Sequence, residues 1–319
     1  MKWGRIGSII LALLLLLIVA VGYNGFRIAE EEETVPLQIS VVVNHSTGSR
    51  WTRFQGGLED AAEDYGVTVN YAVTGSISSL YFQERIVRRE AEDADGLILQ
   101  LVDSAEAAEL INSLSREKVL ILVDTDAASE AGDACSSVTA DNRLAGQLLA
   151  EAVREDFGEQ TAQLRAGILS GNRKMDSMQE RLQYFLNGFE EQGGTVAWTI
   201  ANVSRLEQMN EEQPVNLLIA LDNESLEAAV DAAENGTLDA AVYGVGCSDK
   251  TIYYLDKGTI RAMVVPDDFL MGYYAVSDAV ERLRAPNSPM KNKTVTCRLI
   301  RPDTIYNEEN EALLFPIIN

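Results

Sequence analysis

The sequence is poor in the residues from which catalytic and metal sites are most often built. Its 319 residues include one histidine, His45, and three cysteines, Cys135, Cys247 and Cys297. A single imidazole cannot form a zinc site with two histidine ligands, and cysteines without short spacing favour neither a tetrahedral metal site nor a disulfide framework. The sequence also lacks a Gly-X-Ser-X-Gly elbow, a His-Glu-X-X-His motif and a P-loop. We therefore expect no metal, no cofactor and no enzymatic activity.

Positive charge is scarce as well. The chain has 26 Lys and Arg residues against 49 Asp and Glu, so its formal net charge is -23 at pH 7. A net charge of this sign repels phosphate backbones and anionic membrane surfaces. We therefore expect no nucleic-acid partner, and we interpret the acidic side chains as a solvated surface that keeps the protein soluble.

A long apolar run lies near the N-terminus. Residues 6–23 carry no charge, Lys2 and Arg5 precede them, and four glutamates follow at residues 30–33. This pattern is typical of a membrane-targeting segment with a cytoplasmic N-terminus, which places everything after residue 29 outside the cytoplasm. We expect an uncleaved anchor; a weak small-residue site at residues 20–22 makes a cleaved signal peptide the alternative. No cysteine directly follows the run, which excludes a lipoprotein.

Beyond residue 36, short apolar runs rich in β-branched residues alternate with amphipathic segments of helical period. The runs lie at residues 38–43, 67–73, 96–100 and 119–123, and again at 166–169, 196–200, 215–221, 240–243 and 260–265. Alternating strands and helices predict parallel sheets, and continuously apolar strands indicate burial on both faces. This alternation of apolar runs and helical segments begins again after residues 141–142. The sequence therefore predicts an α/β protein with two doubly wound parallel-sheet lobes.

Polar side chains directly follow several predicted strands. In open parallel sheets, ligands bind beyond the carboxyl ends of the strands, where the loops converge. The candidate contacts from this rule are Asn44, Arg50, Trp51, Gln100, Asp124, Asp126 and Asp222. Amides, carboxylates, a guanidinium and an indole suit a polyhydroxylated ligand such as a sugar, because the polar groups bond hydroxyls and the ring covers a C–H face. Any single Asn or Asp at these places has a second interpretation as a helix cap or turn former.

The stretch VVVNHSTGSRW, at residues 41–51, is the first of these strand ends. We interpret it as a buried strand followed by a loop that forms one wall of a ligand cleft. His45 belongs to this loop, and we interpret it as a residue that lines the cleft or the surface, not as a catalytic group.

Several short motifs occur in a defined order along the chain. They are WTRFQGGLEDAA at residues 51–62, DGLILQ at 95–100, LILVDTD at 120–126, VTADNRLAG at 138–146 and SMQERLQYF at 177–185. Their order and spacing resemble the type I periplasmic sugar-binding proteins, the ribose- and galactose-binding group of solute-binding proteins for ABC transporters. The resemblance extends over about residues 37–306.

This resemblance implies two lobes joined by a three-stranded hinge, after a segment of membrane anchor and linker at residues 1–36. The N-terminal lobe would comprise residues 37–140 and 267–294, and the C-terminal lobe residues 141–266 and 295–319.

The resemblance also implies roles for individual residues. Trp51 would stack on the sugar, and Gln100 and Asp124 would bond its hydroxyls from the first lobe. Arg181 and Asp222 would do so from the second lobe.

The sequence departs from the family pattern at four positions. Gly246 and Pro266 stand where the family has an aspartate and a glutamine, Tyr184 replaces a glycine, and Arg50 takes the place of an aromatic residue. Because two polar contacts of the second lobe are lost, the resemblance leaves the identity of the sugar open.

These patterns together predict an extracytoplasmic, monomeric solute-binding protein that closes two lobes around a small polar ligand, a sugar. Its partner would be an ABC-type permease, or alternatively a membrane sensor kinase that reads the closed state. An extracytoplasmic enzyme on the same fold is a third, less favoured interpretation. A repressor is disfavoured, because a membrane segment stands where a DNA-binding helix-turn-helix would be needed.

Overall fold

The computed structural model describes residues 36–126 and 134–315. The predicted membrane segment at residues 6–23 lies outside these ranges. Within them, no helix has the length and apolar character needed to cross a membrane.

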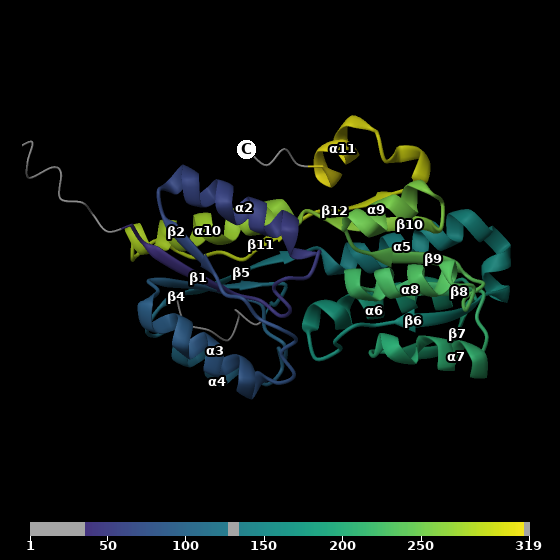
Figure 1. Ribbon diagram of the computed structural model, residues 1–319, viewed down its shortest axis with the longest axis horizontal. Helices are drawn as coiled ribbons and strands as arrows, with labels where there is room; N and C mark the ends of the chain where they lie inside the picture. The colour runs from purple at the N-terminus through teal and green to yellow at the C-terminus, as the bar shows by residue number, and fades with distance from the viewer. Residues whose placement is uncertain (1–35, 127–133, 316–319) are drawn as a thin grey trace, which may run out of the picture. The chain divides into compact units, whose positions relative to one another are not determined.

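The first sheet has six strands, all parallel (Figure 1). Their order across the sheet is β11 (Lys293–Val295), β5 (Cys135–Ala140), β4 (Val119–Val123), β3 (Gly96–Leu99), β1 (Gln38–Val42) and β2 (Thr68–Tyr71). Except for β2 and β11, these strands are almost entirely buried, because helices cover both faces of the sheet.

Four helices cover this sheet, and with it they form the first lobe (Figure 1). They are α2 (Trp51–Tyr65) and α10 (Asp268–Arg284) on one face, and α3 (Leu80–Asp93) and α4 (Ala108–Leu114) on the other. Alternate side chains of one strand serve the two faces: Ile98 packs with α2 and α10, whereas Leu97 and Leu99 pack with α3 and α4.

The second sheet also has six strands. Their order is β12 (Cys297–Ile300), β10 (Ile260–Pro266), β9 (Ala241–Val245), β8 (Leu217–Ala220), β6 (Arg165–Leu169) and β7 (Thr195–Ile200). Only β12 is antiparallel to its neighbour.

The second lobe consists of this sheet and the elements packed against it. Its helices are α5 (Asn142–Phe157), α6 (Asp176–Glu191), α7 (Leu206–Glu212), α8 (Asn223–Glu234), α9 (Asp249–Asp256) and α11 (Glu308–Leu314), with short 3-10 turns η2 (Gly158–Gln163), η3 (Val203–Arg205) and η4 (Pro302–Thr304). The helices α5 and α6 cover one face of the sheet, and α7, α8 and α9 cover the other.

The chain passes between the two sheets three times. The passages lead from β5 to α5, from β10 to α10 and from β11 to β12. Backbone hydrogen bonds join them, from Asp141 N to Val295 O at 3.0 Å and from Asp267 N to Thr296 O at 3.2 Å. Elements from late in the sequence, α10 and β11, therefore complete the first lobe.

The predicted α/β class with two parallel-sheet lobes is confirmed, since each of the nine predicted apolar runs coincides with a strand. Three strands, β5, β11 and β12, were not predicted from the sequence. Strand β5 was missed because Ser136 and Ser137 make its sequence polar, although both side chains are buried in the sheet.

Glycines allow the helices α2 and α10 to pack closely. A Cβ added at Gly57 would overlap the carbonyl oxygen of Phe269, and one added at Gly272 would overlap that of Phe54. The two helix backbones therefore touch where they cross, and no other residue type fits there without moving a helix.

We expect Gly57→Ala to lower the free energy of unfolding by about 1 to 3 kcal/mol, because the methyl group forces α2 away from α10. Chemical denaturation with circular dichroism measures the change. Gly75→Ala is the matched control, since a Cβ there meets no atom within 4 Å. Equal stability of the two variants would contradict the close helix crossing.

Candidate functional site

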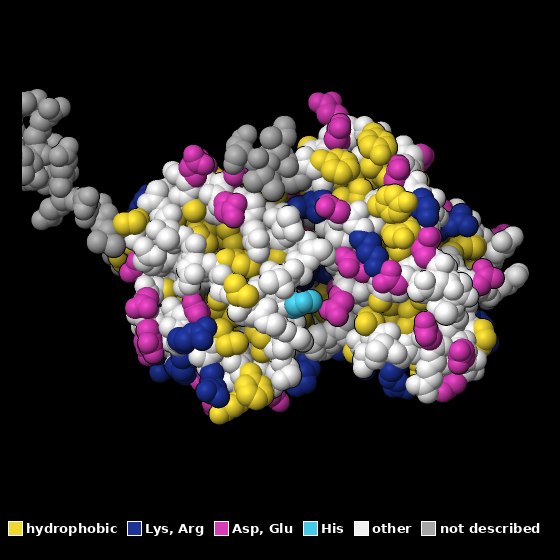
Figure 2. Space-filling view, viewed as in Figure 1, with side chains coloured by type: hydrophobic (Ala, Val, Ile, Leu, Met, Phe, Trp, Pro, Cys, Tyr) yellow, Lys and Arg dark blue, Asp and Glu magenta, His cyan; other side chains and the backbone are white. Residues whose placement is uncertain are grey.

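A cavity of about 640 Å³ lies where the carboxyl ends of the strands of both sheets face each other. Segments of the first lobe line one side, at residues 44–51, 76–79 and 100–103. Segments of the second lobe line the other, at residues 171–178 and 222–227. Figure 2 shows the hollow between the lobes, with the single histidine, His45, at its edge.

The structure brings five of the eight predicted site residues to this cavity: Asn44, Arg50, Trp51, Gln100 and Asp222. The other three, Asp124, Asp126 and Arg181, do not line it. Their positions differ and are described below.

Hydrogen bonds hold the loop after β1 in place as a wall of the cavity. The Asn44 backbone N donates to Oε1 of Gln100 at 3.2 Å, and the Asn44 side-chain oxygen accepts from the backbone N of Ile77 at 2.7 Å. The indole Nε1 of Trp51 donates to the Asn44 carbonyl oxygen at 3.1 Å. These contacts leave the side-chain amino group of Asn44 as a donor near the cavity, whereas that of Gln100 interacts with the Asp124 carboxylate.

Trp51 lies at the start of α2, and its ring is already covered. The residue is 3% exposed, and its ring packs edge-on against Phe54 with 5.2 Å between centroids. The guanidinium carbon of Arg50 lies 4.5 Å from the ring centroid, in a cation–π arrangement. In this conformation Arg50 covers the face of the Trp51 ring on which the family resemblance had placed a sugar.

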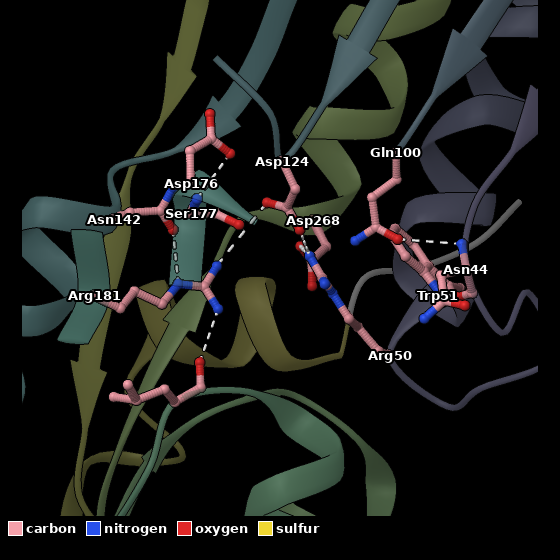
Figure 3. Close-up of polar contacts among 11 residues, drawn as sticks. Asn44, Arg50, Trp51, Gln100, Asp124, Asn142, Asp176, Ser177, Arg181 and Asp268 are labelled. Carbon is pink, nitrogen blue, oxygen red and sulfur yellow. Dashed lines mark hydrogen bonds and ion pairs between the residues drawn. The ribbon is translucent and has the colours of Figure 1, made fainter. Parts of the chain in front are cut away.

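A cluster of buried charges surrounds the guanidinium of Arg50, the one member of the cluster that lines the cavity (Figure 3). Arg50 hydrogen-bonds the carboxylate of Asp124 and lies 4.0 Å from Oδ1 of Asp268. From the second lobe, Nη2 of Arg181 approaches Oδ1 of Asp124 to 4.0 Å. Asp124 has a φ of 53°, a left-handed conformation that a non-glycine residue adopts at some cost, so the site holds it against local preference.

The pKa values of the two carboxylates of this cluster shift in opposite directions. Burial alone would raise the pKa of Asp124, but the guanidinium groups of Arg50 and Arg181 outweigh it and hold this pKa below its usual value. Burial raises the pKa of Asp268 to about 6, because the more distant Arg50 compensates less and the negative charge of Asp124 adds to the shift. Asp124 is thus a charged acceptor at neutral pH, while Asp268 titrates close to physiological pH.

Arg181 is buried beneath the cavity in α6, only 2% exposed. Its Nε donates to Oδ1 of Asn142 at 2.7 Å, and its Nη1 donates to the carbonyl oxygen of Leu221 at 3.0 Å. Its Nη2 has no hydrogen-bond partner in the described part of the chain and points toward Asp124 (Figure 3). The side chain therefore connects α6 to α5 and to the end of β8 by hydrogen bonds, while its Nη2 donor remains unused.

The two remaining predicted aspartates both hydrogen-bond other parts of the protein. Asp222 lines the cavity and caps α8, because its Oδ1 accepts from the backbone N of Ser225 at 2.7 Å. Asp126 is exposed and accepts hydrogen bonds from Ser137 and Asn292 outside the cavity.

Hydrogen bonds across the two lobes were not predicted. Ser49 Oγ donates to Oε1 of Glu227 at 2.8 Å on one side of the cavity, and on the other Lys174 Nζ donates to Oδ2 of Asp103 at 2.7 Å. Hydrogen bonds therefore join the two lobes on both sides of the cavity. No local sequence pattern marks such pairs, because their members are 178 and 71 residues apart.

Comparison with known proteins agrees with this architecture. A family model described as a periplasmic binding protein domain matches residues 39–286. The chain belongs to this family. No curated protein sequence matches it.

Solved structures of sugar-binding proteins are similar to this periplasmic binding protein in fold. GanP, a glucose-galactose binding protein from Geobacillus stearothermophilus, is 22% identical with a TM-score of 0.73, over 85% of this chain and 99% of that one. A carbohydrate transporter solute-binding protein from Agrobacterium radiobacter, in complex with D-arabinose, is 18% identical with a TM-score of 0.77, over 88% and 99%. XylFII, also solved as a XylFII-LytSN complex, is 17% identical with a TM-score of 0.73, over 84% and 99%.

The described residues of this periplasmic binding protein include no group of three or more His, Cys, Asp or Glu side chains that could hold a metal ion. The cysteines Cys135, Cys247 and Cys297 are free and buried, and burial raises the pKa of each thiol to about 12. These thiols stay protonated at neutral pH and are poor nucleophiles.

Proposed function

We propose that this periplasmic binding protein is an extracytoplasmic solute-binding protein that closes its lobes around a sugar for uptake by an ABC-type permease. The observation that carries the proposal is the cavity between the lobes, walled by amides, hydroxyls and carboxylates. Its volume lies within the range of small-molecule sites. The sugar-binding proteins that share the fold support the same ligand class.

The charges at the cavity disfavour an anionic ligand. The two basic side chains that line it are both paired, Arg50 with Asp124 and Lys174 with Asp103. Asp222 offers a carboxylate oxygen, and Asn44 offers an amide donor, so hydroxyl groups find both an acceptor and a donor.

Closure is the proposed mechanism. A ligand that touches both lobes binds the closed form more tightly than the open form and shifts the population toward it. The three chain passages serve as the hinge, and the rim contacts Ser49–Glu227 and Lys174–Asp103 form only when the lobes meet. We propose lobe boundaries near residues 140, 266 and 294, and a monomeric binding unit that binds its ligand without turnover.

A second output is signalling, in which the closed form is read by a membrane sensor kinase. The XylFII-LytSN complex, formed by a protein of similar fold, favours this alternative. Uptake of radiolabelled sugar by cells with and without the protein separates the two outputs. Loss of uptake in the deletion strain supports transport, whereas unchanged uptake with lost gene induction supports signalling.

Residues 6–23 would tether the protein to the outer side of the cell membrane, with Lys2 and Arg5 in the cytoplasm. We expect Edman sequencing of the mature protein to begin at or near Met1. A start at Tyr23 would instead identify a cleaved signal peptide.

The ligand class is tested by a thermal-shift screen of residues 37–319 against D-glucose, D-galactose, D-arabinose and D-tagatose. A ligand at about 100 times its Kd stabilises the protein by roughly 2.7 kcal/mol. We expect the same sugar to change the fluorescence of Trp51 at the cavity, and to leave that of Trp198 unchanged. Trp198 is buried in the second sheet, and its Nε1 donates to the Gln213 carbonyl oxygen.

The single-tryptophan variants Trp198→Phe and Trp51→Phe separate the two signals. A ligand-induced change that persists in Trp51→Phe would contradict the position of the site. Failure of every sugar to raise the melting temperature would contradict the ligand class.

A further inference from the structure

The Arg50 side chain lies between the two groups of the first lobe best suited to hold a sugar. Its guanidinium covers the Trp51 ring at 4.5 Å and hydrogen-bonds the Asp124 carboxylate. An indole face and a charged acceptor beside each other are the pairing that a pyranose or furanose ring requires, one for its C–H face and one for its hydroxyls. Arg50 itself remains 19% exposed and lines the cavity.

Arg50 does not satisfy all the buried polar atoms around it. Three atoms around it are buried without a hydrogen-bond partner in the described residues: Oδ1 of Asp124, Oδ1 of Asp268 and Nη2 of Arg181. Buried polar atoms of folded proteins nearly always have partners, and each atom left without one lowers stability. A guanidinium only donates, so it can never satisfy the Nη2 donor of Arg181.

A hydroxyl group has the property that Arg50 lacks. It donates to a carboxylate and at the same time accepts from a guanidinium. Adjacent hydroxyls of a sugar could therefore bond Asp124 and Arg181 together, across the two lobes. The Arg50 side chain can turn away if the ligand compensates its contacts with Asp124, Asp268 and Trp51, because it lines the cavity and has four rotatable bonds.

We propose that Arg50 is a specificity-determining residue that acts as an internal competitor of the ligand. Its guanidinium covers the Trp51 ring and bonds the Asp124 carboxylate at the cavity. A sugar reaches Trp51 and Asp124 only by displacing it. This inference rests on the proposed sugar-binding function, and it implies that the apparent affinity is lower than the cavity without Arg50 would provide.

The test is calorimetric titration of the protein with D-glucose, D-galactose, D-arabinose and D-tagatose, in wild type and in Arg50→Ala. One charge-assisted hydrogen bond corresponds to roughly a tenfold to hundredfold change in Kd, so we expect Arg50→Ala to bind the preferred sugar at least about tenfold more tightly. Arg85→Ala on the exposed face of α3 makes the same change of charge and should bind like wild type.

Weaker or unchanged binding in Arg50→Ala, with binding in wild type, overturns the competitor role and leaves the sugar-binding function standing. Weaker binding would mean that the ligand contacts Arg50 instead of replacing it, and unchanged binding would mean that Arg50 does not affect the affinity. Absence of binding in wild type together with binding in Arg50→Ala supports the competitor role. Absence of binding by both proteins overturns the inference and the proposed function alike.

Removal of Arg50 leaves Asp124 with a weaker partner, so folding is checked by circular dichroism. If Arg50→Ala does not fold, Arg50→Ala/Asp124→Asn removes the unpaired charge and is compared with Asp124→Asn alone. The competitor role requires tighter binding in the double variant than in the single one. Equal or weaker binding in the double variant overturns it.

Discussion

Arg181→Ala is expected to lower the free energy of unfolding by about 3 to 5 kcal/mol, the range for removal of one partner from a buried charge pair. The side chain is 2% exposed, and it donates to Asn142 and to the Leu221 carbonyl oxygen while facing Asp124. Truncation leaves the Asn142 and Leu221 oxygens without this donor and removes the positive charge that faces Asp124. Thermal and chemical denaturation measure the loss.

The same substitution should weaken sugar binding by about tenfold to hundredfold, because the unpaired Nη2 is the one donor of this side chain available to a ligand. Calorimetric titration is carried out at a temperature where both proteins are folded, so that affinity and stability are measured separately.

The matched control for this prediction is Arg143→Ala. Arg143 is exposed and pairs with Glu180 at the surface, an interaction worth little. We expect it to melt and bind like wild type. Unchanged affinity in folded Arg181→Ala would show that Arg181 has a structural role only, and unchanged stability would contradict the buried network.

Asp268→Asn is expected to stabilise the protein at neutral pH by up to about 3 kcal/mol. The pKa of Asp268 is raised to about 6 in the folded protein, above the value of about 3.9 for an exposed aspartate. Folding therefore favours the protonated carboxyl. Its contribution to stability is fully present below about pH 3.9 and is lost as the pH rises through about 6. Asparagine stays neutral throughout and keeps that contribution.

The difference in unfolding free energy between Asp268→Asn and wild type should accordingly be small near pH 4, grow between pH 4 and 6 and level off above pH 7. Urea denaturation at several pH values measures it. Asp93→Asn, on the exposed end of α3, should show little difference at any pH. A variant less stable than wild type at pH 7.5 would mean that the ion pair of Asp268 with Arg50 outweighs the cost of burial.

The local sequence determined the fold class, because each parallel strand buried on both faces leaves a continuous apolar run. The residues of β4, VLILV, are an example. Strand β5 was missed, since Ser136 and Ser137 are buried by tertiary packing that no short window reveals. The glycine contacts between α2 and α10 were likewise out of reach, because the two helices are some 200 residues apart in the chain.

The sequence also predicted where the cavity lies, since loops after parallel strands meet at one edge of each sheet. Asn44, Gln100 and Asp222 are at the cavity for this reason. Only the tertiary structure decided what each side chain does there. Position along a strand does not specify side-chain direction within a closed pair of lobes, so Asp126 turns outward and Arg181 lies beneath the cavity.

The relation between Arg50, Trp51 and Asp124 is the clearest case. The sequence identified all three as candidates, but it treated them as independent contacts to one ligand. In the folded protein Arg50 contacts both of the others, because the turn before α2 brings its guanidinium to the end of β4, 74 residues away in the chain. Long-range packing, which local patterns do not encode, thus decided these contacts, on which the proposed competitor role of Arg50 rests.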